Sequence, residues 1–289
     1  MMRIALFLAT NLGVMLIASV VLRLLGVDQM VNGGMTASLI YCAVFGMTGS
    51  IISLFMSKGM AKRSSGAEVI ETPRNETEQW LLDTTARLSE KAGIDTPEVA
   101  IFPSPQPNAF ATGWNKNAAL MAVSVGLLNN MNRDEVEAVI GHELGHIANG
   151  DMVTLALVQG IVNTFVIFFA RIIGQTVDRA LFRGNGYGMG YYISYMAAQF
   201  VLGFLASAIV MWFSRFREFR ADVAGAELAG REKMIAALQA LKGPSDQPSE
   251  MPDTLVAFGI NGGLAEGMRK LFMSHPPLDE RINALRNAG

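Results

Sequence analysis

Four long apolar stretches alternate with more polar segments along this chain. They cover residues 4–25, 35–56, 152–173 and 191–213, and only Arg23 and Arg171 place a charge within them. A helix needs about 20 mostly apolar residues to cross the hydrocarbon core of a bilayer. The pattern therefore predicts four transmembrane helices. A cleaved signal peptide is the alternative for the first stretch, but its apolar run is too long and no small-x-small cleavage site follows cleanly.

The segment 64–151 has the mixed pattern of a soluble domain. We expect a helix over residues 73–90 that ends at Gly93, followed by a strand over residues 98–102. Residues 108–113 and 118–124 are two further strand candidates, and the four residues between them have turn chemistry. The segment therefore predicts a small sheet that contains a β-hairpin.

The segment 214–289 also has the mixed pattern of polar and apolar residues that is typical of a soluble domain. A helical stretch from Arg215 to Asp222 runs into an alanine-rich helix that reaches about Lys242. A loop rich in proline and serine follows at residues 243–253, and a short helix ends the chain. Between the third and fourth apolar stretches, the glycine-rich segment 183–190 lacks the Lys-Ser/Thr pair of a phosphate-binding loop, so we interpret it as a turn between two spans.

One helix in the first soluble segment has clear start and stop signals. Asn132 is a good N-cap, and Glu135 three residues later can complete a capping box. Four apolar residues recur at helical spacing and predict a buried stripe: Val136, Ile140, Leu144 and Ile147. Gly141 and Gly145 are costly inside a helix, so they indicate close packing against another element or room beside a bound group.

The same helix carries His142-Glu143-Leu144-Gly145-His146, an H-E-x-x-H pattern. Residues four apart lie on one helix face, so both imidazoles can reach one metal ion, for which zinc is the first candidate. Glu143 beside the first histidine can hold and deprotonate a water molecule. The chain has three histidines in total. The alternative interpretation is two helix histidines that fall four apart by chance.

A catalytic zinc site needs a third protein ligand. His275 is one candidate, and Glu218 is the better one because it lies on a helix-like stretch with Asp222 one turn further on the same face. A carboxylate at the position of Asp222 can accept the second ring N–H of a ligating histidine and fix its tautomer. The alternative for both acids is a solvated helix face among Arg215, Arg217 and Arg220, all three in the same stretch.

Composition supports a membrane protein and excludes some function classes. The chain is 51% hydrophobic and 17% charged, whereas soluble domains carry about 25% charged residues. A net charge of −2 argues against nucleic-acid binding. Cys42 is the only cysteine, so neither an internal disulfide nor a cysteine-based zinc site can form.

Positive charges at the ends of the apolar stretches predict the topology. Arg3 precedes the first stretch, and Lys58, Lys62 and Arg63 follow the second. The positive-inside rule then places the N-terminus and residue 60 in the cytoplasm. Ligands of one ion must lie on one side of the membrane, and two spans separate His146 from the second soluble segment. The whole soluble part is therefore expected in the cytoplasm, with the metal about 10 Å from the membrane surface or slightly inside it.

Four segments together resemble the HtpX-type membrane metalloproteases, which are relatives of the CAAX prenyl proteases. They are His142–Met152, Arg215–Asp222, Asn108–Gly113 and the stretch from His275 to Arg281. The four apolar stretches match in number and placement, so the resemblance covers nearly the whole chain. It implies a mainly α membrane protein: four transmembrane helices plus a cytoplasmic gluzincin-type metalloprotease domain with a small β-sheet, formed by residues 64–151 and 214–289.

The resemblance also implies an activity and a set of roles. It implies a zinc endopeptidase of the bacterial inner membrane, induced by heat or envelope stress, that acts on unfolded or damaged membrane proteins. One Zn²⁺ per chain would be held by His142, His146 and Glu218, with Glu143 as general base and Asp222 as the partner of a ligand histidine.

Three further roles are expected around this centre. His275 is the candidate donor to the oxyanion, by elimination and by the resemblance, and its alternative is an ordinary surface histidine. Arg281 can pair with Asp222 or Glu218, or it is a solvated arginine. The candidate substrate strand comprises Asn108, Ala109, Phe110, Ala111, Thr112 and Gly113, because proteases often bind an extended peptide along a sheet edge. Its alternative is an ordinary core hairpin.

Two other functions are alternatives to the degradation of damaged membrane proteins, which is a form of protein quality control. One is a processing protease of narrow specificity, and the other is a membrane scaffold with a purely structural metal site. Glu143 argues against the scaffold, because a structural zinc site has no use for a carboxylate that activates water and usually fills its fourth position with protein. The expected partners are protein substrates and the lipid bilayer, without nucleic acid.

Overall fold

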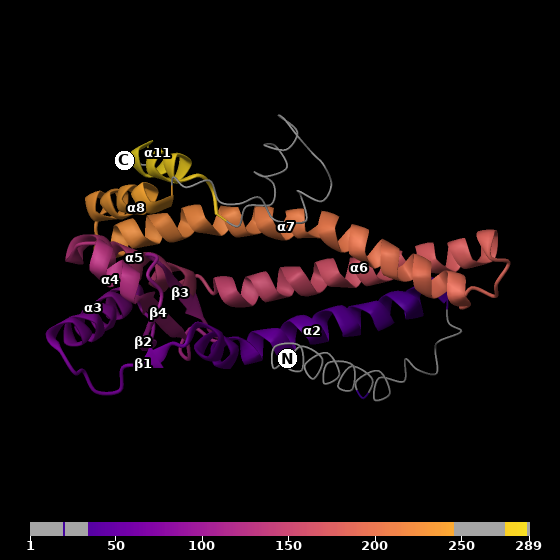
Figure 1. Ribbon diagram of the computed structural model, residues 1–289, viewed down its shortest axis with the longest axis horizontal. Coiled ribbons are helices and arrows are strands. Elements are labelled where there is room, and N and C mark those ends of the chain that lie inside the picture. The colour runs from indigo at the N-terminus through magenta and orange to yellow at the C-terminus, as the bar shows by residue number, and fades with distance from the viewer. Residues whose placement is uncertain (1–19, 21–33, 246–274, 288–289) are drawn as a thin grey trace. The chain divides into compact units, whose positions relative to one another are not determined.

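The computed structural model describes residue 20 and residues 34–245 and 275–287 of the chain (Figure 1). These residues fall into two compact units. The first unit contains Leu155–Val210 and the described chain up to Leu54, and the second contains Phe55–Thr154 and the described chain from Met211 onward.

The first unit is built from three long helices, which also contribute residues to the second unit. They are α2 (Gly34–Ser65), α6 (Asp151–Leu181) and α7 (Met189–Ala229). Each is long and apolar enough to cross a membrane, with mean hydropathy of 1.9, 2.0 and 1.9 in its most apolar window. Three of the four predicted spans are therefore helices, and the predicted span 4–25 lies outside the described residues except for Val20.

Helices α2 and α6 of the first unit approach each other closely at small residues. A Cβ atom added at Gly46 of α2 would lie 2.6 Å from the backbone nitrogen of Thr164 on α6. One added at Gly160 would lie 2.6 Å from the sulfur of Met47. Small residues commonly permit such contacts between membrane helices, where backbone packing replaces the hydrophobic effect.

A four-stranded mixed sheet lies in the second unit. The strands are β1 (Glu68–Val69), β2 (Glu98–Phe102), β3 (Ala109–Thr112) and β4 (Leu120–Ser124), in the order β1-β2-β4-β3. Strands β3 and β4 are antiparallel, which confirms the predicted hairpin, whereas β2 and β4 run parallel. All five residues of β4 are buried, so this central strand anchors the sheet in the core.

The helices of the second unit pack around α5 and the sheet. They are α3 (Glu76–Ala92), α4 (Val125–Asn130), α5 (Arg133–Ala148), α8 (Arg231–Ser245) and α11 (Leu278–Asn287). Helix α3 begins after Asn75, whose side chain accepts a hydrogen bond from the Glu78 amide, rather than at Pro73. It ends at Gly93 as predicted, because Gly93 adopts a left-handed conformation with φ of 67°.

The expected alanine-rich helix from Arg215 to Lys242 is instead divided between two helices. Helix α7 continues unbroken from the apolar stretch to Ala229, and α8 begins at Arg231. Gly230 between them has φ of 113°, which only glycine adopts readily. The chain therefore turns here and brings α8 onto α5, with Met234 and Leu238 in the core.

Helix α5 has the predicted N-terminus and core face. The Asn132 side chain accepts from the Glu135 amide at 3.0 Å, and the Glu135 carboxylate accepts from the Asn132 amide at 2.9 Å. The predicted stripe of Val136, Ile140, Leu144 and Ile147 is buried in the main core cluster. Because α5 contacts α3, α8 and β3, its position is fixed from several sides.

The two glycines of α5 face the end of α7. A Cβ added at Gly145 would lie 2.8 Å from the Cβ of Ala224, and one added at Gly141 would lie 3.4 Å from the Cα of Gly225. The predicted close packing is therefore confirmed. The contact brings the side chains of α7 near Glu218 within reach of the histidines on α5.

We expect Gly145→Ala to destabilise the protein, although alanine normally favours a helix by about 1 kcal/mol over glycine. The added methyl group overlaps Ala224, and overpacking of this kind costs about 1–3 kcal/mol. Thermal unfolding in detergent measures the change. Gly59→Ala in α2 is the matched control, because a Cβ there meets no atom within 4 Å.

A second variant tests the cause of this loss. In Gly145→Ala with Ala224→Gly, the colliding methyl group is removed, so part of the lost stability should return. A Gly145→Ala protein as stable as the Gly59→Ala control would show that the two helices do not depend on this close approach.

Candidate metal centre

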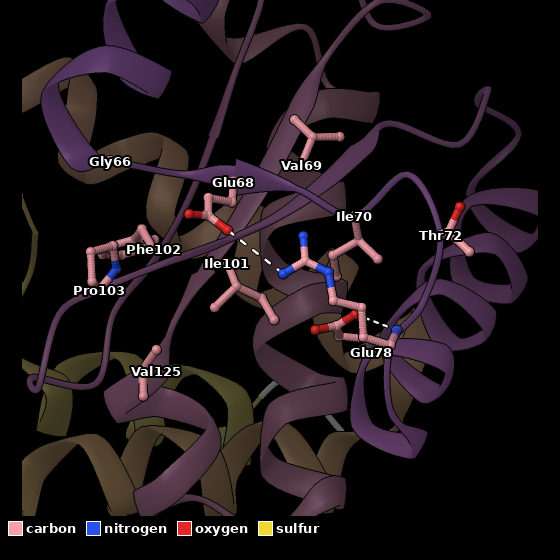
Figure 2. Close-up of a pocket in the computed structure, with 11 residues that line it drawn as sticks. Gly66, Glu68, Val69, Ile70, Thr72, Glu78, Ile101, Phe102, Pro103 and Val125 are labelled. Carbon is pink, nitrogen blue, oxygen red and sulfur yellow. Dashed lines mark hydrogen bonds and ion pairs between the residues drawn. The ribbon is translucent and has the colours of Figure 1, made fainter.

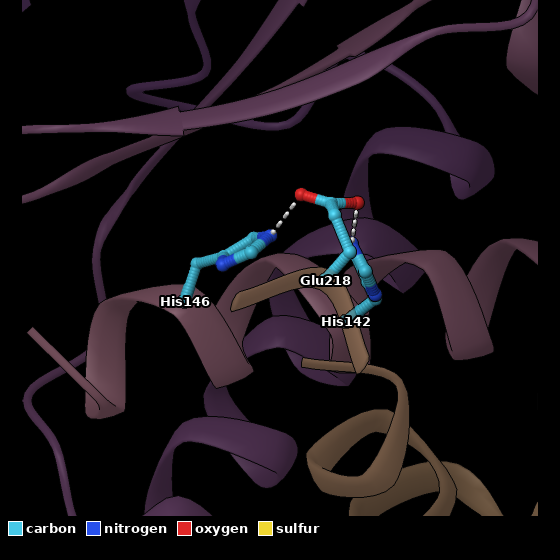
Figure 3. Close-up of side chains that lie close together, drawn as sticks. All are labelled: His142, His146 and Glu218. Carbon is cyan, nitrogen blue, oxygen red and sulfur yellow. Dashed lines mark ion pairs between the residues drawn. The ribbon is translucent and has the colours of Figure 1, made fainter. Parts of the chain in front are cut away.

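Two histidines from α5 and one glutamate from α7 converge in the second unit (Figure 3). His142 and His146 lie one turn apart, and their rings are 4.8 Å apart at the centroids. Glu218 lies between them: its Oε2 is 3.6 Å from His142 Nε2, and its Oε1 is 3.3 Å from His146 Nε2. One ligand atom from each residue lies within 4.8 Å of the other two.

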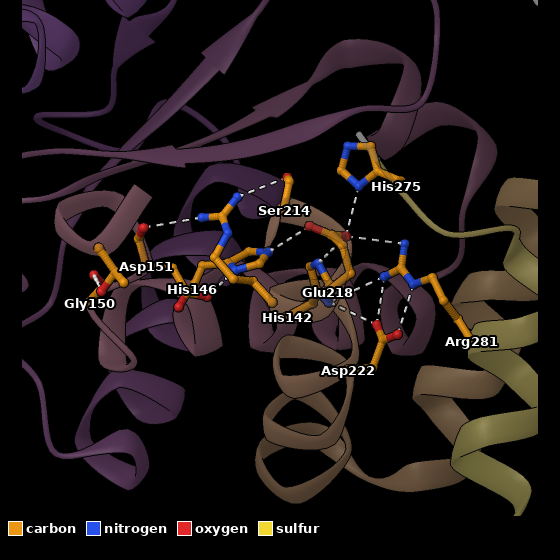
Figure 4. A network of polar contacts seen from close by, with 11 residues as sticks. His142, His146, Gly150, Asp151, Ser214, Glu218, Asp222, His275 and Arg281 are labelled. Carbon is orange, nitrogen blue, oxygen red and sulfur yellow. Dashed lines mark hydrogen bonds and ion pairs between the residues drawn. The ribbon is translucent and has the colours of Figure 1, made fainter. Parts of the chain in front are cut away.

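The second nitrogen of each ring contacts a buried carboxylate (Figure 4). His142 Nδ1 is 3.0 Å from an oxygen of Asp222, and His146 Nδ1 is 2.7 Å from an oxygen of Asp151. A neutral ring that donates through Nδ1–H keeps its lone pair on Nε2. Both lone pairs then point toward Glu218, which is the arrangement that a shared cation needs.

This donor set fits a metal ion. Two imidazole nitrogens and one carboxylate oxygen are the ligands of many catalytic zinc sites, in which the fourth position stays open. Glu218 is only 2% exposed, so its charge requires compensation from a cation or from hydrogen bonds. The three residues therefore fit a metal ion both by geometry and by chemistry.

Arg281 from α11 compensates the acidic residues behind this site. Its Nε and Nη2 donate to the two oxygens of Asp222 at 2.8 and 2.6 Å. Its Nη1 lies 3.4 Å from Glu218 Oε2. Because Arg281 is buried, this paired contact joins the C-terminal helix to the carboxylate that contacts His142.

The acidic surroundings favour protons on both histidines when no cation is bound. Burial lowers the pKa of His146, but its hydrogen bonds with Asp151 and Glu218 outweigh burial and raise that pKa to about 9. Burial also opposes the charged form of His142, whose contacts with Asp222 and Glu218 raise its pKa. A metal ion must therefore displace protons, and its affinity should decrease as the pH falls.

Glu143 and His275 lie beside the metal site. Glu143 is half-buried on α5, and its charge acts on both His146 and Arg281. His275 precedes α11, and its Nδ1 lies 2.7 Å from Glu218 Oε2, while its side chain is 63% exposed. The structure thus brings the chain's three histidines to one carboxylate.

The candidate substrate strand corresponds to β3 with one flanking residue at each end. Strand β3 covers Ala109–Thr112, so Asn108 and Gly113 lie just outside it. Within the described part of the chain, β3 pairs with β4 on one side and with no strand on the other. Since β3 also contacts α5, it is a half-buried edge strand next to the helix that carries the histidines.

A pocket of about 260 Å³ lies at the opposite edge of the sheet, beside β1 (Figure 2). Its lining includes Gly66, Ile70 and Val125. The charged residues Glu68 and Arg74 stand 4.0 Å apart there and are largely exposed. None of the residues that line it belongs to the histidine cluster, so the two sites are distinct.

Sequence reasoning missed Asp151 and Arg217. Asp151 is 1% exposed, contacts His146 and begins α6. Arg217 of α7 donates from Nη1 to the backbone oxygen of Asp151 at 3.2 Å and from Nη2 to the hydroxyl of Ser214 at 3.1 Å. In the sequence, Asp151 is a single acidic residue between the histidine helix and the predicted span 152–173, and nothing there distinguishes it from the end of a soluble segment.

A helix with the H-E-x-x-H pattern and a glutamate from a second helix, beside a small mixed sheet, define a metalloprotease fold and site. The family model of Peptidase family M48 matches residues 75–288. The chain therefore belongs to Peptidase family M48.

Relatives match over the whole length. The chain is 62% identical over 289 residues to Protease HtpX of Hahella chejuensis, which covers 99% of both chains. It is 61% identical over 290 residues to Protease HtpX of Ectopseudomonas mendocina, which covers 100% of both. With its membrane-length helices, the chain is thus a multi-pass membrane metalloprotease of the HtpX type, as the sequence resemblance indicated.

A solved structure shares the fold. The crystal structure of S. mikatae Ste24p has a TM-score of 0.64 and 17% sequence identity to this chain. The match covers 92% of this chain and 65% of the Ste24p chain. At this low sequence identity, the similarity shows that the two chains share the arrangement of their helices and strands.

We expect Asp151→Asn to lower metal affinity about 10–100-fold, the usual cost of losing a carboxylate that orients a ligating histidine. The backbone oxygen that binds Arg217 remains, so the protein should stay folded. Competition with a chromogenic chelator gives the affinity. Asp83→Asn is the control, because it removes an exposed carboxylate of α3. An affinity equal to that of the control would show that Asp151 does not orient His146.

Proposed function

We propose that this chain is a zinc-dependent endopeptidase of the bacterial inner membrane that hydrolyses misfolded or damaged membrane proteins. The observation that carries the proposal is the convergence of His142, His146 and Glu218, with Glu143 beside them and with each histidine oriented by a carboxylate. The relatives named Protease HtpX support the same class of reaction.

Zinc is the proposed metal because of its ligands. His142, His146 and Glu218 would hold the ion, and Asp222 and Asp151 would fix the two rings. When bound, Zn²⁺ supplies Lewis-acid chemistry, which polarises a peptide carbonyl and lowers the pKa of a water molecule to about 7.

Glu143 is the proposed general base. It accepts the proton of a water molecule that attacks the peptide carbonyl, and it passes that proton to the leaving amine. Its position next to His142 on a helix with a capped N-terminus keeps the carboxylate at the site. A base placed in this way contributes about 10²–10⁴-fold to the rate.

His275 and Arg281 are proposed to act on the other side of the site. The carbonyl oxygen gains negative charge as the tetrahedral intermediate forms, and a ring N–H of His275 can donate to it. The exposed ring of His275 can reach a substrate while its Nδ1 contacts Glu218. Arg281 holds α11, and therefore this segment, against Asp222.

The edge strand β3 is the proposed binding surface for the substrate backbone. Hydrogen bonds to an added strand recognise the main chain of the substrate, so binding depends little on its side chains. A protease that clears many damaged proteins needs such tolerance. The edge position of β3 and its contact with α5 support this role.

The cytoplasmic side is proposed for the metal site. Lys62 and Arg63 lie in the last turn of α2, in the part of this helix that belongs to the second unit. Basic residues at the end of a membrane helix favour the cytoplasm. The first predicted span, residues 4–25, completes a topology with four crossings.

Two variants separate metal binding from catalysis. We expect Glu143→Ala to retain zinc and to lose cleavage of unfolded proteins by about 10²–10⁴-fold. Glu218→Ala should lose both zinc and cleavage, because only two ligands remain. Metal analysis of the purified variants and digestion of several unrelated unfolded proteins provide the two measurements.

The control is Glu227→Ala, which removes an exposed carboxylate from the same helix as Glu218. It should retain both properties. If Glu218→Ala kept full zinc and activity, the proposed third ligand would be wrong. Cleavage of one substrate only, at one sequence, would replace quality control with a narrow processing role.

A further inference from the structure

The chain's five tyrosines all belong to the first unit, far in sequence from the histidine helix. Tyr187 and Tyr192 each place their ring centroid 5.3 Å from that of Tyr191, and Tyr195 stacks on Tyr191 at 5.7 Å. Tyr41 of α2 is the fifth. Tyrosine is enriched where a membrane helix leaves the hydrocarbon core, because its ring is apolar and its hydroxyl is polar.

Arg171 of α6 lies among these rings. Its guanidinium carbon is 4.7 Å from the centroid of Tyr41, and its charge also acts on Tyr191 and Tyr195. Its Nε is buried and has no hydrogen-bond partner. In the described part of the chain, Arg171 forms no salt bridge. The guanidinium thus lies on the Tyr41 ring, and neither a carboxylate nor a hydrogen-bond acceptor among the described residues pairs with it.

The carboxylate of Asp178 does not neutralise Arg171. Asp178 is the only acid among the described residues of the first unit, and its oxygens accept hydrogen bonds from the backbone. The amides of Gly186 and Gly188 donate to Oδ2 at 2.9 and 3.1 Å, and the amide of Tyr191 donates to Oδ1 at 3.2 Å. These amides and the charge of Arg179 therefore compensate Asp178, and Arg171 has no counter-charge among the described residues.

Helix lengths place Arg171 at a membrane boundary. It follows Asp151, the first residue of α6, by about 20 residues, which is about 30 Å of helix. Tyr195 precedes Arg215 on α7 by about the same distance. Since about 30 Å is the thickness of the hydrocarbon core, both residues lie near the level of lipid phosphates.

We propose that Arg171, with Tyr41, forms a binding site for an anionic phospholipid headgroup, whose phosphate charge is not offset by an ammonium group as it is in phosphatidylcholine. The planar guanidinium can donate two parallel hydrogen bonds to a phosphate while one face stays on the Tyr41 ring. A half-buried arginine at this boundary without a carboxylate partner is costly, and an anionic headgroup offsets that cost. The site lies outside the metal centre and does not depend on its chemistry.

The test uses the full chain in nanodiscs. We measure its thermal midpoint in phosphatidylcholine and with rising fractions of phosphatidylglycerol. The wild type should gain about 2–4 °C from the anionic lipid. Arg171→Gln should lose this gain, and Arg171→Lys, which keeps the charge without the planar fork, should show a reduced gain. Arg183→Gln is the matched control: it removes an exposed positive charge from the following turn and should retain the gain.

Each outcome decides the proposal. An equal gain in Arg171→Gln, or a loss of the gain in Arg183→Gln, would show a general charge effect and overturn the site. If Arg171→Gln does not fold in phosphatidylcholine, Arg171→Lys decides, and a full gain in that variant overturns the proposal. Inorganic phosphate added to phosphatidylcholine nanodiscs should produce no gain, and a gain equal to that of the lipid would identify a free anion as the ligand instead.

Discussion

The backbone contact between α5 and α7 is the constraint on which the metal centre depends. Gly145 of α5 faces Ala224 of α7 with no room for an added Cβ, and a Cβ added at Gly225 of α7 would lie 3.1 Å from the backbone nitrogen of His142. Helices with ordinary side chains at a contact pack about 8–10 Å apart at their axes. A carboxylate such as Glu218 has a short reach, so the two histidines and the glutamate can share one cation only because the helices meet at small residues.

The charges of the site form a buried set in which each member needs the others. Asp151 and Asp222 orient the rings, Arg281 balances Asp222, and Glu218 faces both histidines. Removing one partner would leave a buried charge without compensation, which costs more than the pair contributes when intact. These residues come from four helices that lie far apart in the sequence. Only the tertiary fold brings each charged side chain to the partner that compensates its charge.

Local signals were predictable from the sequence, and long-range ones were not. The capping box at Asn132, the helix end at Gly93 and the hairpin all follow from short-range rules and were correct. The histidine pair and the spacing of Glu218 and Asp222 pointed to the right neighbours for the same reason. In contrast, the parallel pairing of β2 and β4, the break at Gly230 and the contact from Asp151 depend on partners distant in sequence. No periodicity encodes them.

The order of the ligands along the chain has a consequence for biogenesis. The histidines of α5 precede two long apolar helices, and Glu218 follows most of the second one. During synthesis, the two histidines are therefore present without Glu218 until α6 and most of α7 have been made. A chain that stops before Glu218 has only two of the three clustered residues and cannot form the site. The site can therefore assemble only in a chain in which α6 and most of α7 have already been made.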